Sequence, residues 1–221
     1  MPNPGEHHPA FEEYCECIYE LHEDSVSVIQ ARIAERLSVS RPSVSEMIKR
    51  MESEGLVRTD GTTITLTESG RTLAISVVRK HRLAERFLTD ILGLSWATAH
   101  REAGKWEHVM SNDVESAMVR VLNNPTTCPH GNPIPGSGHV GVATAPLSSV
   151  ATGADFTVSR IPETLEFAPG ILDFLEEVHL LPGRVGNVVS TNNDGSIEVR
   201  VEGRSVTVDA YASARLMVEA K

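Results

Sequence analysis

Histidine and glutamate recur at helical spacing in two neighbouring segments of the chain. In residues 80–87 (KHRLAERF), His81 and Glu85 are four positions apart, so in a helix their side chains share one face. In residues 95–110, further candidates fall along one side of a second helix: His100, Gly104, Glu107 and His108. A single His–Glu pair is more often a surface ion pair, but three histidines and two glutamates favour a site for a divalent cation. Imidazole and carboxylate without thiolate suit Mn²⁺, Fe²⁺, Co²⁺ or Zn²⁺; the alternative is a polar seam between helices.

Three predicted helices must position these side chains. Apolar residues at helical spacing predict one helix over residues 10–23 and a long one over about 67–92, and a third begins near Ser95 and runs to about Met110. Ser111 caps a further helix, whose apolar stripe is the candidate dimer interface. The stripe consists of Val114, Met118, Val121 and Leu122.

The segment between the first helix and the long helix predicts a DNA-binding motif. Ile29, Ile33 and Leu37 mark one helix, and after a short SVS turn Ser40 caps another helix that stops at Gly55. The runs LVRT and ITLT, joined by a DGTT turn, predict a two-stranded wing. This order is that of a winged helix-turn-helix, and the alternative is a plain helical core.

The second helix of such a motif enters the major groove of double-stranded operator DNA with its N-terminal residues near the bases. The candidate DNA contacts are Ser40, Arg41, Pro42, Ser43, Ser45, Glu46, Lys49 and Arg50. Contacts to phosphates are predicted for Arg32, Arg36 and Arg58.

Composition restricts the classes of protein that remain. The chain has 221 residues, three cysteines and a net charge of −10. DNA binding by so acidic a chain requires a local basic face or bound cations that neutralise carboxylates. The sequence shows no secretory leader and no apolar run of membrane-spanning length, and with sparse cysteines this predicts a cytoplasmic protein without a membrane partner.

Four segments are expected along the chain. Residues 1–70 form the DNA-binding part, residues 71–136 the helical metal-binding part, and residues 137–155 a linker rich in Pro, Gly, Ser and Thr. In residues 156–221, short alternating runs and an NDG turn predict a small β-barrel-like domain.

The combined motifs resemble the diphtheria-toxin-repressor family of metal-dependent bacterial regulators. The matching stretches, within about residues 10–136, are ARIAERLSVSRPSVSEMIKRMESEGLV, LTESGRTLA, RKHRLAERFLTDILG, EAGKWEHVMS and GNPIPG. The resemblance implies a mainly α fold with a winged helix-turn-helix, a helical metal-binding and dimerisation domain, and a C-terminal SH3-like (FeoA-type) domain. It also implies a homodimeric transcriptional repressor that is activated by a divalent metal and controls metal homeostasis.

The same resemblance implies two metal sites. The ancillary site would contain His81, Glu85 and His100. The primary site would contain Glu13, Glu107 and His108, with Glu16 as an extra ligand. Relatives carry cysteine or glutamate where this chain has Gly104, so a backbone carbonyl or water must serve there. Glu166 and Asp173 are candidate ligands from the C-terminal domain, and of the two sites the primary one is expected to matter more for activation.

The ligand types favour Mn²⁺, with Fe²⁺ next. Glu13 stands where iron sensors of the family place methionine, and no sulfur ligand is expected. Cys128 and His130, in the segment CPHG, are assigned to loop structure because no second pair completes a zinc site. Two other functions stay open: a winged-helix regulator that responds to an organic ligand, which the polar ligand set opposes, and a metallohydrolase, for which no HExxH motif is present. No enzyme activity and no organic substrate are expected.

Overall fold

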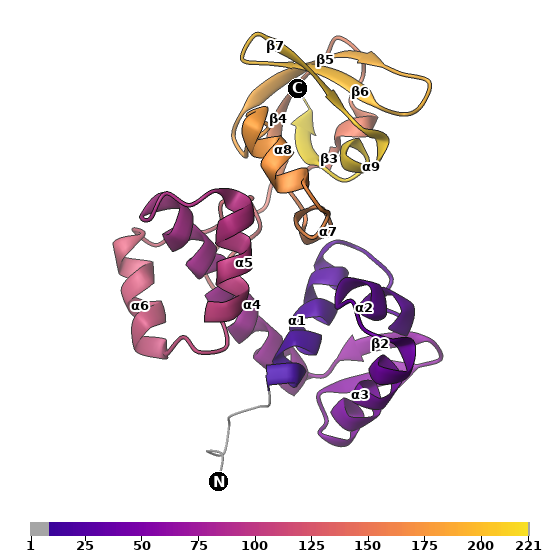
Figure 1. Cartoon of the computed structure of the whole chain (residues 1–221), viewed down its shortest axis with the longest axis vertical. Helices are drawn as coiled ribbons and strands as arrows, with labels where there is room; N and C mark the ends of the chain where they lie inside the picture. The colour runs from indigo at the N-terminus through magenta and orange to yellow at the C-terminus, as the bar shows by residue number, and fades with distance from the viewer. Residues whose placement is uncertain (1–8, 221) are drawn as a thin grey trace.

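The computed structural model describes residues 9–220, so residues 1–8 and 221 of the expected first and last domains lie outside it. Figure 1 shows three groups of elements, with the C-terminal sheet above the N-terminal and central helices. The N-terminal group consists of α1 (Pro9–Glu23), α2 (Gln30–Arg36), α3 (Arg41–Ser53), β1 (Val57–Asp60) and β2 (Thr63–Leu66). The central group consists of α4 (Glu68–Asp90), α5 (Trp96–Trp106) and α6 (Asn112–Val121).

The N-terminal group has the predicted helices and hairpin. The Ser40 side chain caps α3 by accepting a hydrogen bond from the Ser43 amide at 3.2 Å. Gly55, with φ of +69°, turns the chain from α3 into the hairpin, in which β1 and β2 pair antiparallel. The core of the group includes the predicted stripe of α3, namely Val44, Ile48 and Met51. The predicted winged helix-turn-helix is therefore confirmed at the level of its elements.

Helix α4 is the element against which α1, α5 and α6 pack. Thr67 caps it by accepting a hydrogen bond from the Gly70 amide, as expected. Helix α5 ends at Trp106, however, and not near Met110, and residues 107–109 form a turn. The helix is therefore shorter than predicted, and Glu107 and His108 lie in the turn that follows it.

Helix α6 begins at the predicted Ser111 cap, whose hydroxyl accepts a hydrogen bond from the Val114 amide. Val114 and Val121 are 46% and 60% exposed, whereas Met118 is buried in the core formed with α4 and α5. The apolar stripe predicted for this helix is thus only partly a free surface, because Met118 points inwards.

The C-terminal group is a six-stranded antiparallel sheet with short helices. Its strands lie in the order β3-β8-β4-β5-β6-β7. The elements are β3 (Ala145–Pro146), the 3-10 turn η1 (Leu147–Ser149), β4 (Asp155–Arg160), α7 (Glu163–Glu166), α8 (Ile171–Glu177), β5 (Val185–Thr191), β6 (Ile197–Val201), β7 (Arg204–Val208), α9 (Ala210–Ser213) and β8 (Met217–Ala220). Because β3 pairs with β8 and Leu147 is fully buried, this group begins near residue 145, earlier than the expected residue 156.

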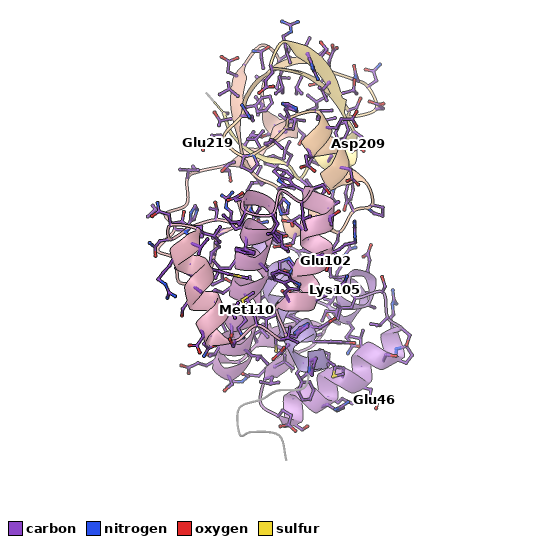
Figure 2. All side chains as sticks on the ribbon, turned by 60° about the vertical axis from the view of Figure 1, so that its left-hand side comes forward. Glu46, Glu102, Lys105, Met110, Asp209 and Glu219 are labelled. Atoms are coloured by element: carbon purple, nitrogen blue, oxygen red, sulfur yellow. The ribbon has the colours of Figure 1, made fainter. Side chains whose placement is uncertain are left out.

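The molecule places the sheet and helix α3 at opposite ends. Figure 2 shows Asp209 and Glu219 near one end and Glu46 of α3 near the other, with Glu102 and Lys105 of α5 between them. None of the helices within residues 9–220 combines the length and the apolar character that a membrane span requires.

Candidate metal centre and DNA-binding face

His81 of α4 lies between two groups of cation-binding side chains. Its Nδ1 is 2.5 Å from Glu107 Oε2, and its Nε2 is 3.3 Å from Glu85 Oε1. Both His81 and Glu85 are buried. A neutral imidazole has a single lone pair for a cation, so His81 can serve as ligand to one group at a time.

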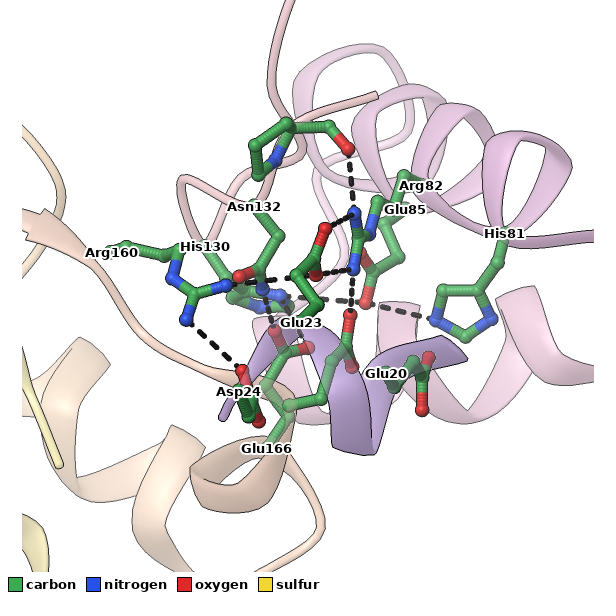
Figure 3. Close-up of polar contacts among 12 residues, drawn as sticks. Glu20, Glu23, Asp24, His81, Arg82, Glu85, His130, Asn132, Arg160 and Glu166 are labelled. Carbon is green, nitrogen blue, oxygen red and sulfur yellow. Dashed lines mark hydrogen bonds and ion pairs between the residues drawn. The ribbon is translucent and has the colours of Figure 1, made fainter. Parts of the chain in front are cut away.

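The first group, called here the enclosed cluster, consists of Glu85, His100, Cys128, His130 and Glu166. His100 Nδ1 is 2.9 Å from Glu85 Oε1, and His130 Nδ1 is 2.7 Å from Glu166 Oε2. Ligand atoms of Glu85, Cys128 and His130 lie within 4.8 Å of one another. Figure 3 shows Glu85, His130 and Glu166 converging from α4, from the loop before Asn132 and from α7. With His100 from α5, four segments of the chain therefore build this cluster.

Cys128 and His130, which the sequence assigns to loop structure, lie among the side chains of the enclosed cluster. Both lie in a loop, as expected, but their side chains are fully buried in the enclosed cluster. The CPHG spacing just before GNPIPG was the available signal. The sequence shows no second pair of metal ligands near this segment. In the structure, Glu85 of α4 and Glu166 of α7 lie beside it instead.

An amide holds the Glu166 carboxylate in place. Asn132 Nδ2 donates to Glu166 Oε1 at 2.5 Å and to the Ile161 carbonyl at 2.9 Å. Fixing a carboxylate in this way leaves its other oxygen directed at His130. Of the two C-terminal candidates, only Glu166 is thus part of a cluster, and Asp173 lines the adjacent cleft.

The second group, called here the cleft cluster, consists of Glu12, Glu13, Glu16, Glu107 and His108. His108 Nδ1 is 2.6 Å from Glu12 Oε2, and His108 Nε2 is 3.2 Å from Glu107 Oε1 and 3.6 Å from Glu13 Oε1. Glu16, with His81 and Glu107, forms a group whose ligand atoms lie within 4.8 Å of one another. Helix α1 thus brings three carboxylates to the end of α5.

Within that cluster the roles on α1 differ from those expected. The Glu13 side chain is 55% exposed, and the contact of His108 with Glu12 is shorter than its contact with Glu13. Glu12 was not predicted, and no sequence signal separates it from Glu13. Glu16, expected only as an extra ligand, is the α1 residue grouped with His81 and Glu107.

A cleft of about 440 Å³ opens beside the cleft cluster. Its lining includes Glu13, Glu16, Gly104, Phe167 and Asp173. A Cβ built at Gly104 would meet nothing within 4 Å. The glycine therefore leaves room beside the cluster that a larger ligand side chain, or water, can fill.

Burial and neighbouring charges shift the pKa values of the side chains in the two clusters. Burial alone would lower the pKa of His81, but the carboxylates of Glu85 and Glu107 raise it well above its usual value. Hydrogen bonds to Glu12 and Glu13 raise the pKa of His108 to about 10. Burial, followed by the charge of Glu107, raises the pKa of Glu16. Without a cation, these shifts favour the protonated form of all three groups.

One buried carboxylate oxygen in each cluster indicates that a cation would fit there. Glu16 Oε1 and Glu85 Oε2 have no hydrogen-bond partner within residues 9–220. A buried polar atom without a partner is costly, and a divalent cation at either cluster would supply the missing interaction. Imidazole, carboxylate and thiol are all groups that ligate divalent metals, so the residues present fit a metal.

The predicted DNA-contacting side chains form the outer face of α3. Except for the half-buried Ser45, they are exposed: Ser40, Arg41, Pro42, Ser43, Glu46, Lys49 and Arg50. The Ser40 and Ser43 hydroxyls are 2.7 Å apart, and Arg50 lies over the Phe11 ring at 5.4 Å. Arg32 is also exposed and pairs with Glu35.

Arg36 does not belong to this face, and the phosphate contact predicted for it is wrong. Its side chain is only 6% exposed. Nη1 lies 3.0 Å from Glu20 Oε2, and Nη2 donates to Thr164 Oγ1 of the C-terminal group at 3.2 Å. The spacing of arginines along α2 gave no indication that this one turns inwards.

A winged helix-turn-helix joined to clusters of buried cation ligands defines a metal-responsive DNA-binding protein. Comparison with known proteins leads to the same class. Residues 8–63 match the profile of the iron dependent repressor, N-terminal DNA binding domain, and residues 67–136 match that of the iron dependent repressor, metal binding and dimerisation domain.

Relatives and solved structures cover almost the whole chain. The iron-dependent repressor IdeR of Mycobacterium tuberculosis is 44% identical over 223 residues, covering 94% of this chain and 96% of the relative. The diphtheria toxin repressor of Corynebacterium diphtheriae is 41% identical, covering 88% and 90%. A manganese-dependent transcriptional repressor in complex with manganese superposes with a TM-score of 0.85 at 31% identity, covering 96% of this chain and all of that one.

The chain belongs to the diphtheria toxin repressor family of iron-dependent repressors. It is a metal-dependent transcriptional repressor of that family.

Proposed function

We propose that a divalent cation, Mn²⁺ first and Fe²⁺ next, switches this protein to a form that binds operator DNA and represses genes of metal homeostasis. One observation carries the proposal. Helix α1 of the DNA-binding part directs Glu12, Glu13 and Glu16 at His108 and Glu107, which follow α5. A cation bound there would tie the DNA-binding part to the metal-binding part.

The cleft cluster would hold the activating cation through Glu16, Glu107 and His108, with His81 available from α4 and Glu13 at the solvent edge. At Gly104 the side chain is missing, so water would complete the coordination. The bound cation would neutralise carboxylates that otherwise repel one another in a chain of net charge −10. It would therefore stabilise the arrangement in which α1 lies against α4 and α5.

The enclosed cluster would hold a second cation between Glu85, Cys128, His130 and Glu166, with His100 beside it. Cys128 changes the argument about metal preference. The expectation of Mn²⁺ rested on the absence of a sulfur ligand, and this still applies to the cleft cluster. A thiolate favours softer metals, so the enclosed cluster is the site at which Fe²⁺ or Zn²⁺ would compete better.

Homodimerisation is proposed through the exposed side of α6, where Val114 and Val121 are uncovered. A two-fold dimer would hold two α3 helices at a fixed separation that matches two operator half-sites. The domain division at residues 70 and 136 and the SH3-like character of the C-terminal sheet are parts of the same proposal.

The test is operator binding followed by fluorescence anisotropy under anaerobic conditions, with chelator, Mn²⁺ or Fe²⁺. We expect both ions to strengthen binding, with Mn²⁺ active at its physiological concentrations. Cys128→Ser should shift the response of the enclosed cluster away from Fe²⁺ and leave activation by Mn²⁺ intact. Equal operator affinity with chelator and with either ion would refute the function, and loss of Mn²⁺ activation in Cys128→Ser would refute the assignment of Mn²⁺ to the cleft cluster.

A further inference from the structure

Helix α7 belongs to the C-terminal group and contacts the other two groups within its four residues. Glu163 lies 3.0 Å from Arg82 of α4, and Thr164 contacts Asp24 just after α1. Glu166 is part of the enclosed cluster. Because these side chains stand on one short helix, a shift of Glu166 moves Thr164 with it.

The contact between Thr164 and Asp24 is specific. Asp24 Oδ2 accepts hydrogen bonds from the Thr164 amide at 2.9 Å and from its hydroxyl at 2.8 Å. Asp24 Oδ1 accepts from Arg160 Nη2 at 3.1 Å, and the carboxylate is almost fully buried. Figure 3 shows Asp24 facing Arg160, with Glu166 on the neighbouring ribbon. Charge-assisted bonds to both oxygens fix the position of α7 against the DNA-binding part.

Arg36 extends this connection to the helix-turn-helix. It is the last residue of α2, directly before the turn that leads to α3. Its guanidinium bonds Thr164 Oγ1 and lies over the Phe167 ring, 4.5 Å from the centroid. The Phe167 ring in turn meets the His100 ring edge-on, with centroids 5.1 Å apart. Phe167 and Arg36, which are in contact, therefore connect His100 of the enclosed cluster with the turn of the DNA-binding motif.

Arg82 holds the same junction from the other side. It is fully buried, bonds Glu23 through both terminal nitrogens and reaches Glu163 and the Pro133 carbonyl. Removing a partner of a buried charge is strongly destabilising, so Arg82 and Glu163 supply rigidity and are unsuitable for variants.

We propose that α7 couples the enclosed cluster to the helix-turn-helix, and that Arg36 and Thr164 are positioning residues for operator binding. A cation held by Glu166 and His130 fixes α7, and the contacts of Thr164 and Arg36 then fix the end of α2, on which the placement of α3 depends. The inference rests on the proposed metal-activated function. It gives Arg36 a role inside the protein, whereas an arginine that contacts phosphate would act at the DNA.

The variants are chosen to separate these two roles. Arg36→Lys keeps the charge but loses the planar fork and the stacking on Phe167. Thr164→Val keeps the shape and loses the hydroxyl. The matched control is Arg184→Lys in the C-terminal group, where no DNA contact is predicted and the side chain, paired with Glu202, is 51% exposed. Phe167→Leu, at a half-exposed position, is the additional variant should Thr164→Val fold poorly.

Full-length protein is titrated onto fluorescent operator DNA at several salt concentrations, with chelator and with whichever of Mn²⁺ or Fe²⁺ activates the wild type. Thermal unfolding is followed in parallel to check folding. We expect Arg36→Lys and Thr164→Val each to reduce the metal-dependent gain in operator affinity about tenfold, within the usual range of coupling between sites. The salt dependence should stay that of the wild type. The double variant should be no worse than either single variant, because both break one connection.

Two results would overturn the inference while the proposed function stands. One is full metal stimulation in Arg36→Lys and Thr164→Val alike, with the wild type activated normally. The other is a salt slope smaller by about one in Arg36→Gln, which removes the charge but keeps a hydrogen-bond donor for Glu20; that result would make Arg36 a phosphate contact. A wild type that no metal stimulates would instead overturn the proposed function together with this inference.

Discussion

The enclosed cluster and the cleft cluster share the ring of His81 but are built in different ways. The enclosed cluster draws on α4, α5, a loop and α7; Glu85 and His130 are fully buried in it, whereas His100 and Glu166 also line the cleft. The cleft cluster joins only α1 and the end of α5, and it borders a cleft of about 440 Å³. The first arrangement suits a cation that fastens the C-terminal group. The second suits a cation that enters from solvent and reports its concentration.

The largest effect is expected where the two clusters meet. His81→Ala removes a ring that faces Glu107 on one side and Glu85 on the other. Metal-stimulated operator binding should fall by about 100-fold, at the upper end of losses for residues at metal sites. On sequence grounds His81 ranks below His108, and we expect its position between the two clusters to reverse this order.

The measurement is operator anisotropy against Mn²⁺ concentration, with His179→Ala as a control because His179 lies exposed on the C-terminal group. A loss in His81→Ala smaller than that in His108→Ala would show that the clusters do not depend on the shared ring.

A smaller effect should distinguish the C-terminal ligands. Glu166→Gln keeps the size of the side chain but removes a charge from the enclosed cluster, so the affinity for the second cation should fall about tenfold. Asp173→Asn changes a carboxylate that only lines the cleft, and its affinities should match those of the wild type. Isothermal titration with Mn²⁺ gives both affinities; equal losses in the two variants would remove the special role of Glu166.

Gly104 offers a way to strengthen the cleft cluster. Nothing lies within 4 Å of a Cβ at this position, so Gly104→Glu should add a carboxylate and tighten Mn²⁺ binding several-fold. Replacing a glycine inside a helix also stabilises the fold by about 1 kcal/mol. Gly104→Ala separates the two contributions, since it raises thermal stability without adding a ligand. Identical Mn²⁺ affinities in the alanine and glutamate variants would exclude position 104 from the coordination.

The smallest effect is a release of protons that both clusters should show. The pKa of His108 is raised to about 10 by its glutamate neighbours, and that of His100 is also raised to about 10, where Glu166 and Glu85 overcome the opposing effect of burial. At pH 7 both rings are therefore protonated without metal, and a cation must displace those protons. The apparent affinity for the cation should therefore rise up to about tenfold per pH unit for each histidine proton that the cation displaces.

Calorimetry in buffers of different ionisation enthalpy at pH 7 measures this release. A binding enthalpy that is independent of the buffer would contradict the protonation states of His100 and His108.

The difference between the enclosed cluster and the cleft cluster also explains which features could be predicted from the sequence. Local signals gave the caps at Ser40, Thr67 and Ser111 and the hairpin after Gly55, because a cap or a turn depends on residues a few positions apart. His81 and Glu85 were found for the same reason. The enclosed cluster depends on contacts between α4, a loop and α7, and no periodicity in the chain records that these segments meet.

The surroundings of two further residues, Arg36 and Cys128, could not be predicted for the same reason. Arg36 has the spacing of a surface residue on α2, yet Glu20 and Thr164 take it inside. Cys128 was judged by the lack of a neighbouring metal motif, although its partner Glu85 is 43 positions earlier in the chain. The spacing of residues along the sequence identifies candidate ligands that share one helix. It does not identify candidate ligands that only tertiary contacts bring together.

The central claim is that a cation joins the DNA-binding part to the metal-binding part through the cleft cluster. The most direct test is the Mn²⁺ affinity of the protein measured by titration with and without saturating operator duplex. Because linkage is reciprocal, operator DNA should tighten Mn²⁺ binding by the same factor by which Mn²⁺ tightens operator binding, and Glu107→Gln should lose both. An Mn²⁺ affinity that is the same with and without the operator would contradict the account.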